Sequence, residues 1–262
     1  MILTTLYLTW VCVSMVRIHS SRLILIYMKT IICPDIHGRD FYKPLLENKE
    51  DSIVFLGDLT DPYYDVDYHT MMERAYEILD FVDQNQERVK ILLSNHDMYY
   101  FFQRAGNARY DHTHHQEIEQ MFHEYRDLFR IAHYENNCLF THAGVNPYWL
   151  EDCRNSHLIT WEEFDNINQN DPQQIADWLN NHCTYDDLKI VGFSRGGWGV
   201  GSCLWADIDE HYTNDLRYNQ IVGHTQQRTT GSFKRYHNII CCDSRAIFEY
   251  SGNLNDFKIW EK

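Results

Sequence analysis

Residues 52–61 read Ser-Ile-Val-Phe-Leu-Gly-Asp-Leu-Thr-Asp, an apolar run of strand length that leads directly into Gly57-Asp58. The next segment, Tyr68–Gln86, has apolar residues at helical spacing on one face, and Val89–Leu93 is a second apolar run. Strand, helix and strand in this order predict a βαβ unit with parallel strands. Polar residues follow both strands, with Asp58 after the first and Ser94-Asn95-His96-Asp97 after the second. We therefore expect a site at the carboxyl edge of the sheet.

The same pattern extends in both directions along the chain. Three more apolar runs, each followed by polar residues, predict buried strands at Lys29–Cys33, Cys138–Thr141 and Asn219–Val222. Asn238–Asp243 and Ala246–Tyr250 are predicted to form a closing hairpin. Helices are expected at Asp40–Leu46, at Gln116–Phe129 and, with an interruption near Asp171-Pro172, at Trp161–Asn180. No linker rich in Gly, Pro or Ser divides the chain, so residues 28–262 are predicted to be one domain.

Residues 1–27 are a separate question, because they hold an apolar run from Met1 to Val16, a polar stretch and a second apolar run. The first run is shorter than the about 20 residues that a membrane-spanning helix needs. No charge precedes Arg17, whereas a secretory signal begins with a basic region. Met28 opens a segment that fits an ordinary first strand. Three interpretations of residues 1–27 therefore stay open: a mis-assigned start, a signal, or an anchor.

Composition narrows the class of protein. The 262 residues are 44% hydrophobic and 23% charged, which is ordinary for a globular domain. A formal net charge of −15 argues against a nucleic-acid polymer as partner, because phosphate backbones are held by Lys and Arg. None of the eight cysteines forms a C-x-x-C pair, so we expect no thiolate zinc site. We expect a cytoplasmic protein with no stable membrane partner, unless residues 1–27 are a genuine signal or anchor.

Five predicted strands are followed by residues that bind hard or borderline metal ions. These candidate ligands are Asp35, His37, Asp58, Asn95, His142 and His224. Carboxylate, imidazole and amide oxygen suit Mn, Fe, Zn or similar ions. Two ions about 3.5–4 Å apart can together hold an attacking hydroxide and polarise a phosphoryl group. A shared carboxylate is the economical way to build such a pair, and Asp58 is our choice.

At these residues the chain resembles the calcineurin-like metallophosphoesterases, nearest to the bacterial and phage branch that is similar to serine/threonine phosphoprotein phosphatases. The matching blocks occur in the expected order, each after a predicted strand: Asp35-Ile36-His37-Gly38, Gly57-Asp58-Leu59-Thr60-Asp61, Asn95-His96-Asp97, Thr141-His142-Ala143-Gly144 and Gly223-His224-Thr225. The resemblance implies an α/β sandwich of two mixed β-sheets flanked by helices, with the metals at loops on one edge.

The resemblance also implies a role for each candidate residue. The first metal ion would be held by Asp35, His37 and Asp58, and the second by Asp58, Asn95, His142 and His224. His96 would be the general acid that protonates the leaving alkoxide, and Asp61 would orient its ring. The implied cofactors are two divalent metal ions, with Mn expected in vitro and Fe, Zn, Ni or Mg as alternatives.

The chain departs from the family at a position that matters for the substrate. Pro62 stands where related protein phosphatases and diadenosine tetraphosphatases carry an arginine that grips the phosphate, which weakens the phosphoprotein interpretation. Another arginine must then bind the phosphate. The candidates are Arg39, Arg195, Arg228 and Arg245, and we favour Arg195, in a glycine-rich segment, followed by Arg39.

The expected function is hydrolysis of phosphate monoesters by a metal-activated hydroxide, on a phosphorylated small molecule or a phosphoprotein. Two alternatives stay open. One is a phosphodiesterase or dinucleoside polyphosphate hydrolase of the same superfamily. The other is a metal-binding scaffold without catalysis, which would hydrolyse no generic substrate when Mn is added. A local cluster of His112, His114 and His115 is expected to be a solvated loop rather than a metal site.

Overall fold

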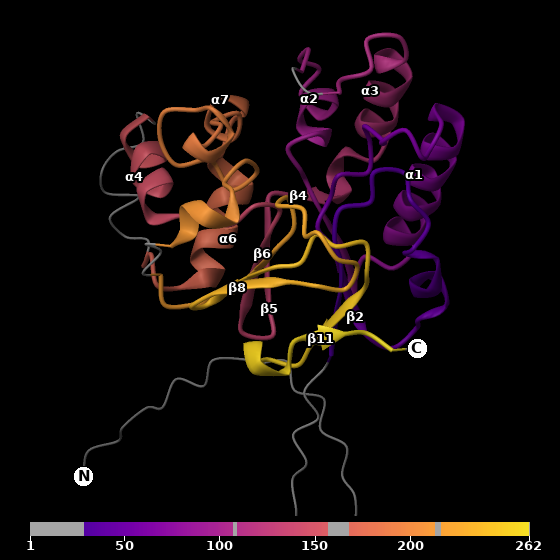
Figure 1. Cartoon of the computed structure of the whole chain (residues 1–262). Helices are drawn as coiled ribbons and strands as arrows, with labels where there is room; N and C mark the ends of the chain where they lie inside the picture. Colours follow the sequence, from indigo (N-terminus) through magenta and orange to yellow (C-terminus); the bar gives the residue numbers. More distant parts are fainter. Residues whose placement is uncertain (1–28, 107–108, 157–167, 213–215, 262) are drawn as a thin grey trace, which may run out of the picture.

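The computed structural model describes residues 29–106, 109–156, 168–212 and 216–261. Within them two β-sheets pack face to face, and helices cover the outer faces (Figure 1). The expected α/β sandwich of two mixed sheets is confirmed. The interpretations of residues 1–27 fall outside the described residues, and so do residues 161–167 of the expected helical segment.

The first sheet has the strand order β11-β10-β1-β2-β3-β4. Its strands are β1 (Thr30–Cys33), β2 (Ser52–Phe55), β3 (Val89–Leu92), β4 (Phe129–Arg130), β10 (Phe248–Tyr250) and β11 (Lys258–Ile259). Strands β1 to β4 run parallel, whereas β10 is antiparallel to β1 and to β11. Helix α1 (Tyr68–Asp83) connects β2 to β3, so the predicted βαβ unit is present.

The second sheet has the order β5-β6-β7-β9-β8 and is also mixed. Its strands are β5 (Ala132–Glu135), β6 (Cys138–Thr141), β7 (Asn219–Val222), β8 (Lys234–Tyr236) and β9 (Ile239–Cys241). The three central strands run parallel, and the two edge strands are antiparallel to their neighbours. Parallel strands in both sheets therefore end toward loops that can share one site.

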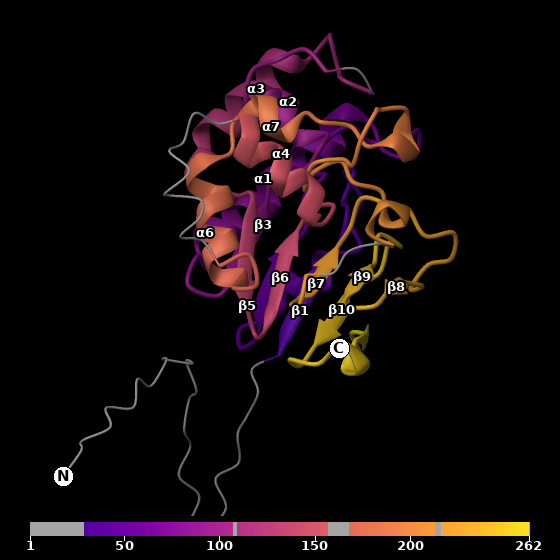
Figure 2. The same cartoon turned by 90° about the vertical axis from the view of Figure 1, so that its left-hand side faces the viewer.

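The helices divide between the two sides of the sandwich (Figures 1 and 2). Helices α1, α2 (Asp97–Phe101) and α3 (His115–Glu124) lie on one side, and α4 (Pro147–Ser156), α6 (Pro172–His182) and α7 (Tyr185–Leu188) on the other. The carboxylate of Asp171 accepts from the backbone N–H groups of Gln173 and Gln174, and Pro172 opens α6. Because proline fits only the first turn of a helix, the interruption expected at Asp171-Pro172 is the start of α6.

Alternation along each strand sends one set of side chains between the sheets and the other toward the helices. Ile32 and Val54 pack in the cluster that contains Phe140 of the second sheet. Their neighbours Ile31 and Ile53 belong instead to the cluster that includes the buried face of α1. Burial on both faces explains why these strands are unbroken apolar runs in the sequence.

The predicted closing hairpin is wrong. Strand β9, within Asn238–Asp243, pairs with β7 and β8, whereas β10, within Ala246–Tyr250, pairs with β1 and β11 in the other sheet. Every residue of both strands is buried, so each strand needs a neighbour on both sides, which an isolated hairpin does not provide. The chain crosses between the sheets through Arg245, whose φ is 58°.

Two predicted helices are shorter than expected. In the segment Asp40–Leu46 only a 3-10 helix forms, Lys43–Glu47, which begins three residues later than expected. Within Gln116–Phe129, α3 ends at Glu124 and a 3-10 turn follows. The helix does not continue because Phe129 pairs with Ile91 at the edge of the first sheet.

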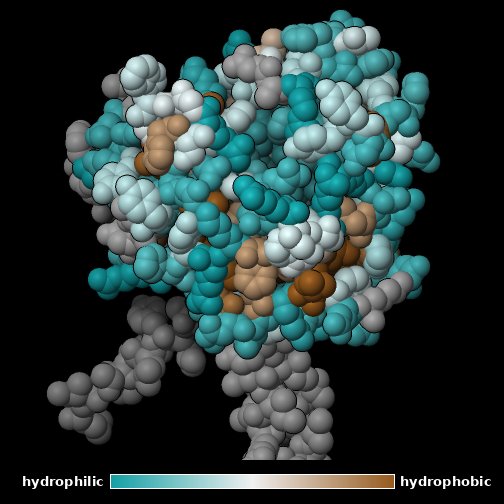
Figure 3. Space-filling view, in the orientation of Figure 1, coloured by the Kyte–Doolittle hydropathy of each residue, from teal (hydrophilic) through white to brown (hydrophobic). Residues whose placement is uncertain are grey.

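The face shown in Figure 3 is mostly hydrophilic, with apolar residues gathered in its lower half. Large exposed apolar side chains include Phe233, which directly precedes β8, and Ile259 of β11. Within the described ranges, the helices are all too short or too polar to cross a membrane.

Candidate metal centre

The candidate ligands follow the carboxyl ends of parallel strands from both sheets. Strand β1 leads to Asp35 and His37, β2 to Asp58, β3 to Asn95 and His96, β6 to His142 and β7 to His224. All seven are buried, with exposed fractions of 0–9%. Asp35 and His224 are 189 residues apart, yet both oxygens of Asp35 accept hydrogen bonds of 3.1 and 3.0 Å from the backbone N–H of His224. The fold thus brings the sequence-predicted ligands to one edge of the sandwich.

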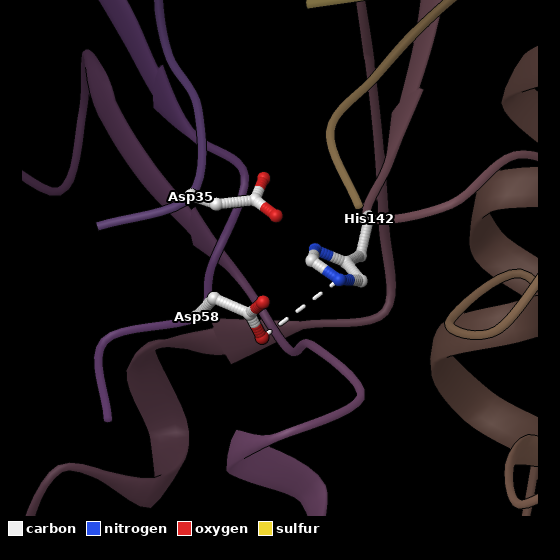
Figure 4. A group of neighbouring side chains, drawn as sticks. All are labelled: Asp35, Asp58 and His142. Carbon is white, nitrogen blue, oxygen red and sulfur yellow. Dashed lines mark ion pairs between the residues drawn. The ribbon is translucent and has the colours of Figure 1, made fainter. Parts of the chain in front are cut away.

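Asp35, Asp58 and His142 form a compact group at this edge (Figure 4). One ligand atom from each lies within 4.8 Å of the others. Figure 4 shows the three side chains turned toward one another from separate segments of the chain. Two carboxylates and an imidazole are a donor set that suits divalent metal ions, so the residues present fit a metal.

The two carboxylate oxygens of Asp58 face different histidines. Oδ2 lies 3.2 Å from Nε2 of His37, and Oδ1 lies 3.8 Å from Nε2 of His142. On the far side of each ring, Nδ1 of His37 donates to the carbonyl of Thr60 at 3.0 Å, and Nδ1 of His142 donates to the carbonyl of Leu56 at 2.8 Å. Because a carbonyl only accepts, both Nδ1 atoms carry hydrogen, and this hydrogen bond directs each Nε2, the atom that would bind a metal, toward Asp58.

A second group of acceptor atoms meets at Asn95. Its Oδ1 lies 2.7 Å from Nε2 of His142 and 3.1 Å from Nδ1 of His224. With Nδ1 of His142 protonated, an oxygen and a nitrogen lone pair face each other, an arrangement that a cation between them makes favourable. Nε2 of His224 is buried and has no hydrogen-bond partner among the described residues. This second group is therefore rich in acceptor atoms.

The pKa shifts of the buried residues at the centre also favour a bound cation. Burial lowers the pKa of His142 and of His224, which favours the neutral imidazole that a metal requires. Burial, together with Asp243 and Asp58, raises the pKa of Asp35 well above its ordinary value. Burial also acts to raise the pKa of Asp58, but His142 and His37 outweigh it and hold that pKa well below the ordinary value. The crowded carboxylates would be relieved by a bound cation.

His96 lies beside the ligands but has other partners. Its Nδ1 is 2.8 Å from Oδ2 of Asp61, and the other oxygen of Asp61 accepts from the hydroxyl of Tyr100 at 2.5 Å. Burial opposes protonation of His96, but Asp58 and Asp61 raise its pKa above the ordinary value. Its Nε2 lies 3.1 Å from Nη2 of Arg109. An imidazole oriented by a buried carboxylate, with its other nitrogen facing a cation, has the geometry of a general acid–base group.

Asp97 holds the loop that carries Asp58 and Asp61. Its carboxylate accepts from the backbone N–H groups of Leu59 and Thr60 and from the hydroxyl of Thr60, at 2.7–3.1 Å. Ten described residues other than glycine have a positive φ, and four of them are site candidates: His37, Asp58, Asp61 and His224. Since this backbone region is costly for side chains with a Cβ, its concentration here marks a functional site.

Both arginines favoured from sequence lie near the centre and are held by acidic side chains. Nη2 of Arg195 is 3.2 Å from Oδ2 of Asp207 and donates to the carbonyl of His224 at 3.4 Å. Nε of Arg39 donates to Asp65 at 3.2 Å. Arg195 therefore lies on the side of the second acceptor group, and Arg39 follows the first block of candidate ligands.

Sequence reasoning missed Arg109, Tyr63 and Asp243. The guanidinium of Arg109 lies 3.8 Å from the ring centroid of Tyr63, whose ring meets that of His37 edge-on at 5.1 Å. No pattern pointed to Arg109, because it lies between α2 and α3, far from any strand end. Asp243 did have a signal, since it closely follows β9, but the hairpin interpretation hid it. Burial, opposed by His37, raises the pKa of Asp243 to about 6.

The local histidine cluster makes contacts of another kind. His114 pairs with Asp111 at 2.7 Å and stacks on the ring of Tyr68 at 3.8 Å. His115 faces Glu119 at 3.2 Å. These contacts explain both side chains without a metal.

A comparison with protein families identifies the family to which this arrangement of residues belongs. A family model for calcineurin-like phosphoesterases matches residues 28–228, a span that contains every candidate ligand. The chain belongs to the calcineurin-like phosphoesterase family. As a member it is a metal-dependent phosphoric ester hydrolase, and the family's divalent metal ions fit the group of Asp35, Asp58 and His142.

Solved structures with the same fold include the cold-active protein-tyrosine phosphatase of a psychrophilic Shewanella species. It is 16% identical, with 89% of this phosphoesterase chain and 80% of that chain covered and a TM-score of 0.50. A mutant of a cold-active protein tyrosine phosphatase gives the same values. A metallophosphoesterase from Sphaerobacter thermophilus, 11% identical over 89% and 88% of the two chains, fits more loosely, with a TM-score of 0.43. Comparison with curated proteins finds no match.

Proposed function

We propose that this phosphoesterase binds two divalent metal ions bridged by Asp58 and hydrolyses phosphate monoesters. The observation that carries the proposal is the orientation of Asp58, whose two oxygens face two separate groups of ligand atoms. The first group is completed by Asp35 and His37, and the second by Asn95, His142 and His224. A carboxylate that serves both groups is the arrangement expected of a bridging ligand.

The residues around the centre have complementary tasks in this proposal. When bound, the two ions supply a nucleophilic hydroxide near neutral pH and neutralise charge on the phosphoryl oxygens. Hydrogen bonds from Nδ1 keep the rings of His37 and His142 oriented with Nε2 inward. His96, with its raised pKa, holds a proton for the leaving oxygen, and Asp61 at Nδ1 fixes the direction of transfer.

Arg109 replaces the arginine that is absent at Pro62. Its guanidinium stacks on Tyr63, the residue next to Pro62, and its Nη2 is 3.1 Å from Nε2 of His96. A phosphoryl oxygen beside Nη2 would accept a hydrogen bond from this guanidinium in place of His96. Arg195 and Arg39 are proposed as further substrate contacts on the two sides of the centre.

The proposed ion in vitro is Mn²⁺, with Fe, Zn, Ni or Mg as alternatives that the same oxygen and imidazole ligands accept. The proposed substrate is a phosphorylated small molecule or a phosphoprotein, in the cytoplasm. The likeness to a protein-tyrosine phosphatase at 16% identity shows the fold alone, so it does not select among these substrates.

The deciding experiment compares p-nitrophenyl phosphate with bis-p-nitrophenyl phosphate. The chain from Met28 is chelated, and Mn²⁺, Zn²⁺, Fe²⁺ or Mg²⁺ is then added back while bound metal is counted. We expect chelation to abolish activity, Mn²⁺ to restore it with two ions per chain, and the monoester to react faster. A faster diester would support a phosphodiesterase instead. A folded protein that binds two ions and hydrolyses neither compound would support the scaffold, and a single ion would overturn the bridged pair.

A further inference from the structure

A cavity of about 390 Å³ lined by three arginines lies beside the metal centre. Arg39, Arg74 and Arg245 contribute the positive charge, and Asp40 and Asp65 are the acidic residues among its walls. The chain has a formal net charge of −15, so a cavity lined by three arginines differs in charge from the chain as a whole. The cavity is therefore suited to an anion rather than to a neutral or cationic group.

The acidic side chains do not satisfy this positive charge. Arg39 pairs with Asp65 at 3.2 Å, and Arg74 pairs with Asp40 at 3.1 Å. Arg245 makes no hydrogen bond or ion pair with another described residue, so its guanidinium lacks a direct acidic partner. Both aspartates are well exposed, with side-chain fractions of 60% for Asp40 and 47% for Asp65, so solvent weakens their hold on the arginines.

Arg39 adds an unsatisfied donor. The residue is only 8% exposed, and its buried Nη2 has no hydrogen-bond partner among the described residues. Nε is used by Asp65, and the ring of Tyr63 lies 4.8 Å from the guanidinium carbon. A buried donor without an acceptor costs stability, and an oxygen from a bound anion would remove that cost.

The cavity is continuous with the metal centre through two residues. Tyr63 contacts Arg39 with its face and meets His37 edge-on. Burial raises the pKa of Asp243, but the charges of His37, Arg39 and Arg245 all act to lower it, which is consistent with a short distance between the first ligand group and the cavity. An anion in the cavity would thus lie near a substrate bound at the centre but would not occupy the metal ligands.

We propose that this cavity binds a second anionic group, a phosphate or carboxylate, of the same substrate whose reacting phosphate lies at the metal centre. The proposal rests on the proposed function and narrows the substrate to molecules that carry two anionic groups. Arg245 and Arg74 form charge-assisted hydrogen bonds to the second group, and Arg39 contributes its free Nη2.

The test measures inhibition of p-nitrophenyl phosphate hydrolysis by the Mn²⁺-loaded protein. The probes are α,ω-alkane diphosphonates with three to eight carbons, each compared with the alkyl monophosphonate of the same length. We expect at least one diphosphonate to bind about tenfold or more tightly than its monophosphonate. Arg245→Gln and Arg74→Gln should each reduce that ratio to near one. Arg228→Gln, in a different cavity lined also by Lys234, is the matched control and should preserve the ratio.

The outcomes separate the two proposals. Equal inhibition by diphosphonates and monophosphonates at every length, or a ratio that survives both arginine substitutions, would overturn the second-anion site while leaving the phosphoesterase proposal intact. Failure of monophosphonates to inhibit, with no hydrolysis, would count against the proposed function itself. If free sulfate changes monophosphonate binding through Arg245 while diphosphonates gain nothing, the cavity takes a separate anion and the substrate assignment is wrong.

Discussion

Carboxylates at opposite edges of the sandwich have opposite surroundings. Where β1 and β2 begin, Glu135 of β5 accepts hydrogen bonds from the hydroxyls of Thr30 and Ser52 at 2.7 and 2.8 Å. His133 lies 3.0 Å from the same carboxylate. Burial alone would raise the pKa of Glu135, but His133, Thr30 and Ser52 lower it below its ordinary value. Glu135 therefore joins the two sheets as a satisfied structural group.

At the edge where the strands end, two carboxylates lie close to each other. Asp35 and Asp58 lie within 4.8 Å of each other, and Asn95 directs its Oδ1 at Nε2 of His142. The pKa of Asp35 is raised where that of Glu135 is lowered. Asp35 thus differs from Glu135: hydroxyls and an imidazole surround Glu135, whereas burial, together with Asp243 and Asp58, raises the pKa of Asp35, a strain that a bound cation would relieve.

Asp58→Asn should have the largest effect, because Asp58 faces both ligand groups. We expect a loss of about a thousandfold or more in kcat/KM, together with loss of bound metal. Metal analysis and p-nitrophenyl phosphate turnover measure both quantities, and the exposed Asp186→Asn is the control. Full metal content in Asp58→Asn would refute the bridging role.

His96→Asn should come next, with bound metal retained. Loss of a general acid costs about a hundredfold to ten-thousandfold for a poor leaving group such as an alkyl phosphate, and much less for p-nitrophenyl phosphate. The informative measurement is therefore the ratio of the turnover rates of the alkyl phosphate and p-nitrophenyl phosphate. If turnover and metal content fall together, His96 is a ligand or a structural residue.

Arg109→Gln should have a smaller effect, because it removes a substrate contact and leaves the ligands in place. One charge-assisted hydrogen bond to phosphate corresponds to about 10–100-fold in kcat/KM. Arg104→Gln, nearby on the same segment and set over the ring of Tyr185, is the matched control. An unchanged kcat/KM in Arg109→Gln would return the phosphate-binding role to Arg195 or Arg39.

The sequence predicted the ligand side of the site far better than its substrate side, for a physical reason. Asp35, Asp58 and His142 each follow a buried strand, so the pattern that predicts the strand also predicts the position of the residue. Arg109 reaches His96 only through the packing of a loop, and no local pattern encodes that contact. Likewise β9 and β10 have the composition of hairpin strands, and only the pairing of distant strands decides that they lie in different sheets.

The two edges should also differ in their effect on the stability of the metal-free protein. Glu135→Gln should lower the free energy of unfolding by about 1–3 kcal/mol, because its hydroxyl partners lose a charged acceptor. Asp35→Asn should instead raise the stability of the metal-free protein by a similar amount, because it removes one of two crowded carboxylates. Urea denaturation of both variants after chelation measures the two effects.

The pH dependence of these two differences tests whether charge is their cause. The pKa of Glu135 is below its ordinary value of 4.5 in the folded chain, so its contribution is complete above that pH and is lost as pH falls through the folded pKa. The pKa of Asp35 is raised, so its carboxyl takes up a proton at a higher pH, and the gain from Asp35→Asn should disappear first on acidification. The stability gain from Asp35→Asn should therefore be absent at a pH where the stability loss from Glu135→Gln has already disappeared. A gain that persists at such a pH would mean that shape, and not crowded charge, distinguishes the two edges.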